Sequence, residues 1–350
     1  MSNRSSHVAG SSRDASHDEA DQVLNALRHE LQLDAVIPAG GRWGKEYSSI
    51  EQKRASGNFE FKSATSPKAL ADALSALQSD GFYFRGQRSA TWKIYSSWQR
   101  KFIEHEHTVE DNEMFRSKVC DALEEIRQAN LTQETVGVSV TELSDYELLG
   151  HLQHYGVATP FIDFAKLPHI ALYFAIQAKG AENSNFHSVY AVDGRYREGE
   201  NEIVDFEDWL KHNDRVDLPK EHLQKRQLHQ YKAWNVSALV FHVDENGWNQ
   251  AIHERRVEKQ TGLFLYMKDL DKPAEEYFAE YHKYLCSNKT QCDSRIMRRM
   301  ICFDFPSSWD NELRTILNAN EITEDSLGLS DHTIEKKWRE ALQPAFPDFF

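Results

Sequence analysis

Apolar residues recur along the chain at two spacings, which predicts a protein of mixed helices and strands. Helical spacing is clearest in SPKALADALSALQSDG, residues 66–81, where leucines share one face between an N-cap serine and a terminal glycine. Similar spacing predicts a long amphipathic helix over residues 108–130 and a helix over residues 144–156 that ends at a glycine. A fourth helix, over residues 167–180, is opened by a proline.

Short apolar runs rich in aromatic and β-branched residues predict strands between these helices. The predicted strands are FYFRG (82–86), TPFIDF (159–164), SVYAVD (188–193), SALVFHV (237–243), TGLFLYM (261–267) and MICFDF (300–305). Helices concentrate early in the chain and near its end. This distribution indicates the α+β class, with a largely antiparallel central sheet flanked by helices.

The same patterns divide the chain into three parts. Residues 1–57 are rich in Ser, Asp and His at their start, so we expect a disordered tail with one short helix. Residues 58–306 hold the predicted strands and form the main domain. Residues 307–350 form a C-terminal extension of two helices that carry apolar residues at helical spacing.

Composition excludes several classes of function. The chain has 350 residues and a formal charge of −14, so duplex DNA is not an expected partner, because binding it needs a basic face. No apolar run reaches the ~20 residues of a membrane helix, and the N-terminus lacks the apolar segment of a secretory signal. The four cysteines lack metal-binding spacing. We therefore expect a cytoplasmic protein without a membrane partner or a metal.

Polar residues gather where the helix over residues 144–156 meets the next strand. His154, Tyr155, Gly156, Thr159 and Asp163 lie within ten residues in HYGVATPFID. Taken alone, His154 is more often a structural helix cap. Asp163 is as consistent with a structural role, as an N-cap or an ion pair that holds the following helix, as with a functional one. Together they lie at a junction of the kind in which binding groups collect on a rigid scaffold.

Two further segments carry polar residues in otherwise apolar surroundings. In FYFRGQ, Arg85 ends a strand beside Gly86 and Gln87. Its side chain can extend to the surface or hold a carboxylate or phosphate, and spacing does not choose between these roles. In RVEKQTGLF, Glu258 and Gln260 are two residues apart and so can face the same side of a strand, and the following glycine fits either a bulge or a close ligand.

The order of these segments resembles that of the FRG domain family, which is named for an aromatic-Arg-Gly motif. The resemblance covers residues 60–305 and rests on FYFRGQ, on LQHYGVATPFIDF with the following PHIALYFA, and on RVEKQTGLF. It implies that the three segments form one site. The residues implied to bind the substrate are Arg85, Gly86, Gln87, Tyr155, Gly156, Thr159, Asp163 and Gly262.

More distantly, the three segments are similar to ADP-ribosyltransferases, in which a Tyr-Arg-Gly or Tyr-His-Gly strand binds NAD and a later strand brings the catalytic acid. This similarity implies NAD as the substrate, an ADP-ribosyltransferase-like arrangement, and Glu258, Gln260 and His154 as catalytic residues. Glutamine cannot act as a base, so Glu258 or Asp163 has to supply the negative charge.

Two hypotheses of function follow. In the first, the chain is an NAD- or nucleotide-binding enzyme, an ADP-ribosyltransferase or NAD glycohydrolase, that acts as an intracellular effector, toxin or defence factor on a target the sequence does not name. In the second, it is a non-catalytic module that binds a nucleotide or a peptide. If Arg85 has only a structural role, it should pair with Asp163 or a nearby carboxylate, because an unpaired buried charge is costly.

Overall fold

The computed structural model describes the backbone of just over half of the chain, in ranges that all fall within one unit, Trp43–Phe350. The described residues are 44–104, 112–129, 131, 139–141, 143, 145–177, 185–193, 238–242, 262–267, 272–287, 299–327, 329 and 333–342. Within these ranges, no helix combines the length and the apolar character needed to cross a membrane.

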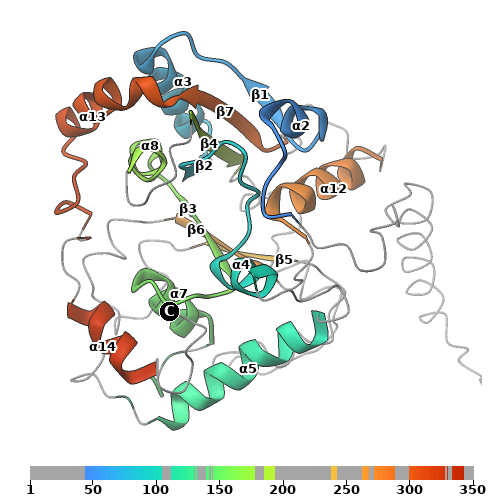
Figure 1. Cartoon of the computed structure of the whole chain (residues 1–350), viewed down its shortest axis with the longest axis vertical. Helices are drawn as coiled ribbons and strands as arrows, with labels where there is room; N and C mark the ends of the chain where they lie inside the picture. Colours follow the sequence, from blue (N-terminus) through green and yellow to red (C-terminus); the bar gives the residue numbers. More distant parts are fainter. Residues whose placement is uncertain are drawn as a thin grey trace, which may run out of the picture. The chain divides into compact units, whose positions relative to one another are not determined.

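The described residues form one sheet with helices on both faces (Figure 1). The strands are β1 (Glu60–Lys62), β2 (Phe82–Gln87), β3 (Phe161–Ala165), β4 (Phe186–Asp193), β5 (Ala238–His242), β6 (Gly262–Met267) and β7 (Ile301–Pro306). The helices are α2 (Ile50–Ala55), α3 (Pro67–Ser79), α4 (Ser97–Glu104), α5 (Asn112–Gln128), α7 (Asp145–His154), α8 (Pro168–Ile176), α12 (Ala274–Ser287), α13 (Asp310–Ala319) and α14 (Thr333–Leu342), and Ser307–Trp309 form a 3₁₀ turn.

The strand order is β1-β7-β4-β2-β3-β6-β5, and every neighbouring pair is antiparallel except β1 and β7. The expected α+β class with a largely antiparallel sheet is therefore confirmed. The pattern of apolar residues explains the helices that cover it. In α3, Ser66 accepts a hydrogen bond from the amide of Ala69 as the N-cap, and Leu70 and Leu74 are fully buried against the sheet.

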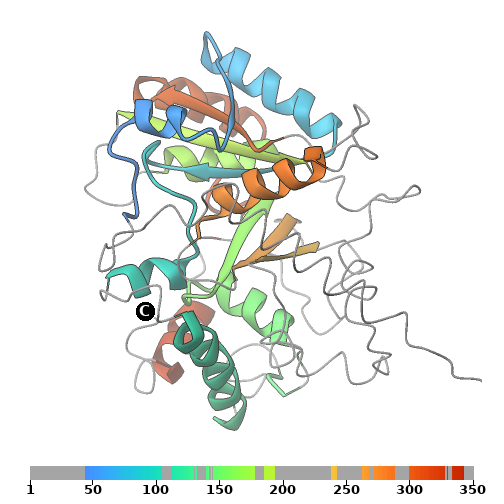
Figure 2. The same cartoon turned by 90° about the vertical axis from the view of Figure 1, so that its right-hand side faces the viewer.

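The sheet consists of two groups of strands that meet at one point. All of β2 pairs with β4, from Phe82 to Gln87, and all of β3 pairs with β6, but β2 and β3 share only the pair Phe84 and Ala165. Figure 2 shows β3 running at a steep angle to β4. Apart from the pair that includes Ala165, side chains rather than backbone pairing therefore connect the two groups of strands. The polar residues of FYFRGQ lie at this junction.

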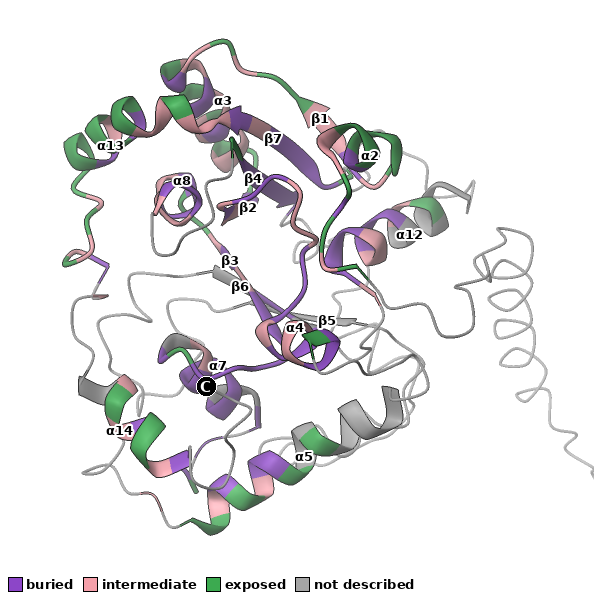
Figure 3. Cartoon of the chain, in the orientation of Figure 1, coloured by how far each residue is buried: buried purple, intermediate pink, exposed green. Residues whose placement is uncertain are grey.

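The two faces of β2 have different surroundings. Phe82 and Phe84 pack in an apolar cluster with α3, α8 and α13, whereas Tyr83 packs on the opposite face, in the cluster that includes Phe278 of α12. Because side chains alternate along a strand, Arg85 and Gln87 lie on the same face as Tyr83. The buried residues follow the strands and the inner sides of the helices, as Figure 3 shows.

Segments that the sequence analysis placed outside the main domain pack directly on it. The ammonium of Lys53, on α2, is fully buried and donates to Ser188 Oγ at 2.9 Å and to Asp304 Oδ1 at 2.7 Å. At the other end, the indole of Trp338 on α14 donates to Nε2 of His151 on α7 at 3.2 Å. Residues 44–57 and the C-terminal helices therefore contribute to the same packed structure as the central sheet.

Candidate functional site

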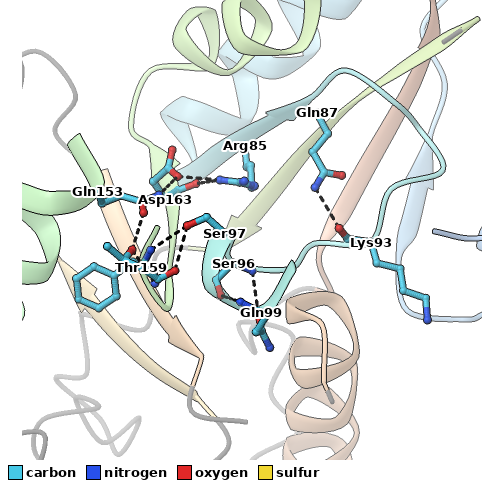
Figure 4. Close-up of polar contacts among 10 residues, drawn as sticks. Arg85, Gln87, Lys93, Ser96, Ser97, Gln99, Gln153, Thr159 and Asp163 are labelled. Carbon is cyan, nitrogen blue, oxygen red and sulfur yellow. Dashed lines mark hydrogen bonds and ion pairs between the residues drawn. The ribbon is translucent and has the colours of Figure 1, made fainter. Parts of the chain in front are cut away.

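An ion pair joins the two groups of strands where β2 and β3 diverge (Figure 4). Nη1 of Arg85 on β2 donates to the backbone oxygen of Asp163 on β3 at 2.8 Å and to its Oδ1 at 3.0 Å. The Arg85 side chain is 13% exposed, whereas that of Asp163 is 49% exposed. The pair therefore has a buried cationic side and an anionic side that solvent or a ligand can reach.

A chain of hydrogen bonds holds Asp163 in this position. Gln153, in the last turn of α7, donates through Nε2 to Asp163 Oδ1 at 3.2 Å and accepts at Oε1 from the hydroxyl of Thr159 at 2.5 Å. The same Thr159 hydroxyl accepts from the amide of Phe161 at 3.2 Å. The hydroxyl of Thr159 thus connects the end of α7 to the start of β3.

Helix α4 is attached to the same threonine. The Thr159 amide donates to Ser97 Oγ at 2.9 Å, and the Thr159 carbonyl accepts from Ser97 Oγ at 3.2 Å and from the amide of Trp98 at 3.1 Å. These bonds fix the first turn of α4 against the start of β3. They also place the next turn of α4, which carries Arg100, near the Arg85–Asp163 pair, with which Arg100 interacts electrostatically.

The charges of this site act on one another. Desolvation alone would raise the pKa of the Asp163 carboxyl, but Arg85 and the hydrogen bonds from the backbone and Gln153 outweigh it, so the pKa is lowered. For Arg100, desolvation and the charge of Arg85 lower the pKa to about 10. Asp163 therefore stays ionised at neutral pH, and two guanidinium groups share a site with it.

Several donors and acceptors of the site have no partner among the residues that the structure describes. Arg85 Nε is buried without one, and Nη2 of the same guanidinium is not fully buried and forms no bond with a described residue. Gln87 is 4% exposed, and its Nε2 donates to the Lys93 carbonyl at 3.4 Å while its Oε1 is unpaired. Unpaired buried polar groups are uncommon in folded proteins and call for an explanation.

The three glycines predicted to bind substrate have different positions. A Cβ on Gly86 would lie 1.8 Å from the Ala171 carbonyl oxygen, so this glycine allows α8 to approach β2. Gly156 has a φ of +76°, follows the end of α7, and lies on the exposed surface. Gly262 begins β6 and pairs with Ala165, at the same junction as the ion pair.

The structure does not place the ring of Tyr155 in the site, and it does not describe the side chain of His154. The ring of Tyr155 is 5% exposed and lies 4.9 Å from the ring of His151, centroid to centroid, so its faces are packed rather than open. The backbone of His154 ends α7, but its side chain is outside the described part of the chain. Glu258 and Gln260 also lie outside the described residues, so their catalytic roles stay predictions.

Three residues of the site were not predicted from the sequence. Gln153 lies inside the quoted motif LQHYG, but nothing in the spacing distinguishes its amide from that of a surface residue. Ser97 and Arg100 lie on α4, which no motif covers. Their placement depends on hydrogen bonds between α4 and Thr159, more than fifty residues away in sequence, and no local pattern reports such a contact.

The described site offers guanidinium donors and an ionised carboxylate, which together suit a ligand with anionic groups and hydroxyls. No group of three or more metal-ligating side chains occurs among the residues that the structure describes.

Comparison with known protein families gives a match to part of the chain. A family model described as the FRG domain matches residues 80–184, a range that contains Arg85, Arg100, Gln153, Thr159 and Asp163. No curated protein and no solved structure matches the chain.

Proposed function

We propose that the region matched by the FRG domain model, residues 80–184, binds NAD at the Arg85–Asp163 junction and cleaves it by an ADP-ribosyltransferase type of reaction. The observation that carries the proposal is the ion pair itself. A positioned guanidinium and a half-exposed, ionised carboxylate lie together where the two groups of strands separate.

The chemistry of NAD cleavage fits these groups. The bond between ribose C1′ and the nicotinamide nitrogen breaks, its electron pair leaves with nicotinamide, and positive charge develops on the ribose. A negative charge fixed near the ribose stabilises that charge in the transition state. We assign this role to Asp163, whose pKa is lowered by Arg85 and by its hydrogen bonds despite desolvation, because it is anionic at neutral pH.

The remaining roles follow from the same arrangement. Arg85 holds a phosphate or a ribose hydroxyl through the part of its guanidinium that Asp163 does not occupy. Gln153 and Thr159 position Asp163, and they do not touch the reacting bond in this scheme. Attack at C1′ by water gives ADP-ribose, and attack by a hydroxyl, amine or carboxylate of a protein target gives a modified target. The second outcome is that of an intracellular effector, toxin or defence factor.

Nicotinamide release tests the proposal. The full chain is incubated with NAD, with and without cell extract, and nicotinamide is measured for the wild type, for Asp163→Asn and for the matched Asp72→Asn. Asp72 is an exposed carboxylate on α3, on the opposite face of the sheet, and its removal should leave the rate unchanged. We expect Asp163→Asn to lower the rate by about 100-fold, because one preorganised charge is worth ~3 kcal/mol in a transition state. A wild-type rate equal to that of Asp163→Asn in both conditions would exclude the enzyme.

A non-catalytic module is the second proposal, and the residue at position 260 favours it. The polar position of the third motif carries glutamine, which cannot act as a base. Calorimetry with NAD and with ADP-ribose separates the two functions. Saturable nucleotide binding without any nicotinamide release supports the binding module, and release supports the enzyme.

A further inference from the structure

Arg100 is a partly buried arginine without a partner among the described residues. It lies on α4, three residues after Ser97, and no hydrogen bond or ion pair of its guanidinium is formed within the described part of the chain. A surface arginine without a partner needs no explanation, because water satisfies it. A guanidinium that is partly withdrawn from water beside a second guanidinium does need one.

The surroundings of Arg100 are positively charged although the whole chain carries −14. Arg85 and Arg88 act on it as like charges, and Asp163 and Glu104 act as opposite charges. One of these two carboxylates is already occupied, because Glu104 accepts from the ammonium of Lys45. Asp163, which already pairs with Arg85, is therefore the carboxylate that remains to balance Arg100.

The unpartnered donors are also concentrated at this place. Asp163 uses only Nη1 of Arg85, so Nη2 forms no bond with a described residue, and neither does the Arg100 guanidinium. Each guanidinium presents its donors as a rigid planar fork that matches phosphate oxygens. A single carboxylate, with two oxygens, is too small to occupy two forks while Asp163 remains in place. A phosphoanhydride has more oxygens and carries at least two negative charges.

We propose that Arg85 and Arg100 together bind the diphosphate group of a nucleotide, with one arginine on each side of the phosphoanhydride. The inference rests on the proposed function, since NAD and ADP-ribose contain this group, but it assigns a residue on α4 that none of the three motifs includes. The hydrogen bonds between Ser97 and Thr159 hold α4 against β3. They thereby fix the backbone of the helix that carries Arg100 relative to the strand that carries Asp163.

Inorganic pyrophosphate is the probe that tests the diphosphate site directly. Its binding to the full chain is measured by calorimetry, beside malonate, which has two carboxylates and no phosphorus. We expect saturable pyrophosphate binding that Arg100→Gln weakens by about 10- to 100-fold, the range for loss of hydrogen bonds to a charged group. Arg100→Lys should recover part of the loss, because it restores the charge without the fork. Lys68→Gln removes an exposed positive charge from α3 and should change nothing.

Stability separates a binding role from a structural one. The side chain of Arg100 has no described hydrogen bond to lose, so Arg100→Gln should melt at the wild-type temperature. An absence of pyrophosphate binding, equal binding of malonate, or equal affinity in Arg100→Gln would each overturn the inference.

The same variant keeps the two proposals apart. If the wild type releases nicotinamide and Arg100→Gln does so with an unchanged KM, the diphosphate site is wrong and the proposed function stands. If pyrophosphate binding depends on Arg100 and no nicotinamide is released, the site stands and the enzyme is wrong.

Discussion

The Arg85–Asp163 pair gives the sharpest prediction about how this site is built, and a double-mutant cycle measures it. Exposed ion pairs typically contribute ~0–1 kcal/mol, whereas breaking a buried pair costs ~3–5 kcal/mol. In this pair Arg85 is 13% exposed and Asp163 is 49% exposed. We therefore expect an intermediate coupling energy of about 2 kcal/mol between Arg85→Met and Asp163→Ala.

The two single variants should differ, because they leave different groups behind. Arg85→Met keeps an apolar stem of similar length and leaves a half-exposed carboxylate that water can solvate, so we expect a loss of about 1 kcal/mol. Asp163→Ala leaves a guanidinium that is 13% exposed with one backbone carbonyl as its described partner. An uncompensated buried charge is more costly, and we expect a loss of about 3 kcal/mol.

Urea denaturation of the four proteins in the cycle gives these values, provided that the slope of the transition is unchanged. The matched control is the same cycle on Lys68 and Asp72, a pair on α3 whose side chains are 76% and 65% exposed. That i,i+4 pair should couple by about 0.5 kcal/mol or less. If the coupling of Arg85 with Asp163 were no larger than that of the control, or if Arg85→Met were the costlier variant, the argument from burial would be refuted.

Two other positions carry predictions of stability. Gly86→Ala should destabilise the fold by about 3 kcal/mol, because the new Cβ would lie 1.8 Å from a backbone oxygen of α8, and a urea midpoint equal to that of the wild type would contradict this. Burial raises the pKa of Glu275 from 4.5 to about 7. Between pH 4.5 and pH 7 the folded chain therefore binds more protons than the unfolded chain. The free energy of unfolding should accordingly fall by about 3 kcal/mol as the pH rises from 4.5 to 7. Glu275→Gln keeps the shape of the side chain but cannot titrate, so its stability should not show this dependence on pH. Superimposable profiles of unfolding free energy against pH for the variant and the wild type, from pH 4.5 to 7, would refute this prediction.

Local patterns were sufficient for the elements of the fold. The helix predicted over residues 66–81 begins with Ser66 as its N-cap, and strand FYFRG is observed as β2 with one further residue. The expected helix over residues 144–156 is α7, and the glycine predicted to end it follows the helix with a positive φ. These features depend on contacts within a few residues, and periodicity and capping chemistry report such contacts directly.

Long-range pairing was not predictable in the same way. Nothing in the apolar spacing shows that β1 pairs with β7 across more than two hundred residues, or that β2 and β3 share a single pair. The buried Lys53 is a further example. A lysine on a short helix is usually a surface residue, and only the proximity of Asp304 and Ser188 in the folded chain makes its burial favourable.

For the site, the sequence identified the pair but left open whether Arg85 faces a ligand or only Asp163. The contacts of the guanidinium indicate that the two roles are compatible. Nη1 donates twice to Asp163, which fixes the plane and direction of the group, while Nη2 forms no bond with a described residue. An ion pair that uses one side of the fork orients the other side, and orienting a donor in advance lowers the entropy cost of binding an anion. Pairing of Arg85 with Asp163 is therefore a condition for the proposed binding of an anion by Arg85 and Arg100. Loss of the Asp163 side chain should weaken pyrophosphate binding, even though it removes a negative charge from the site.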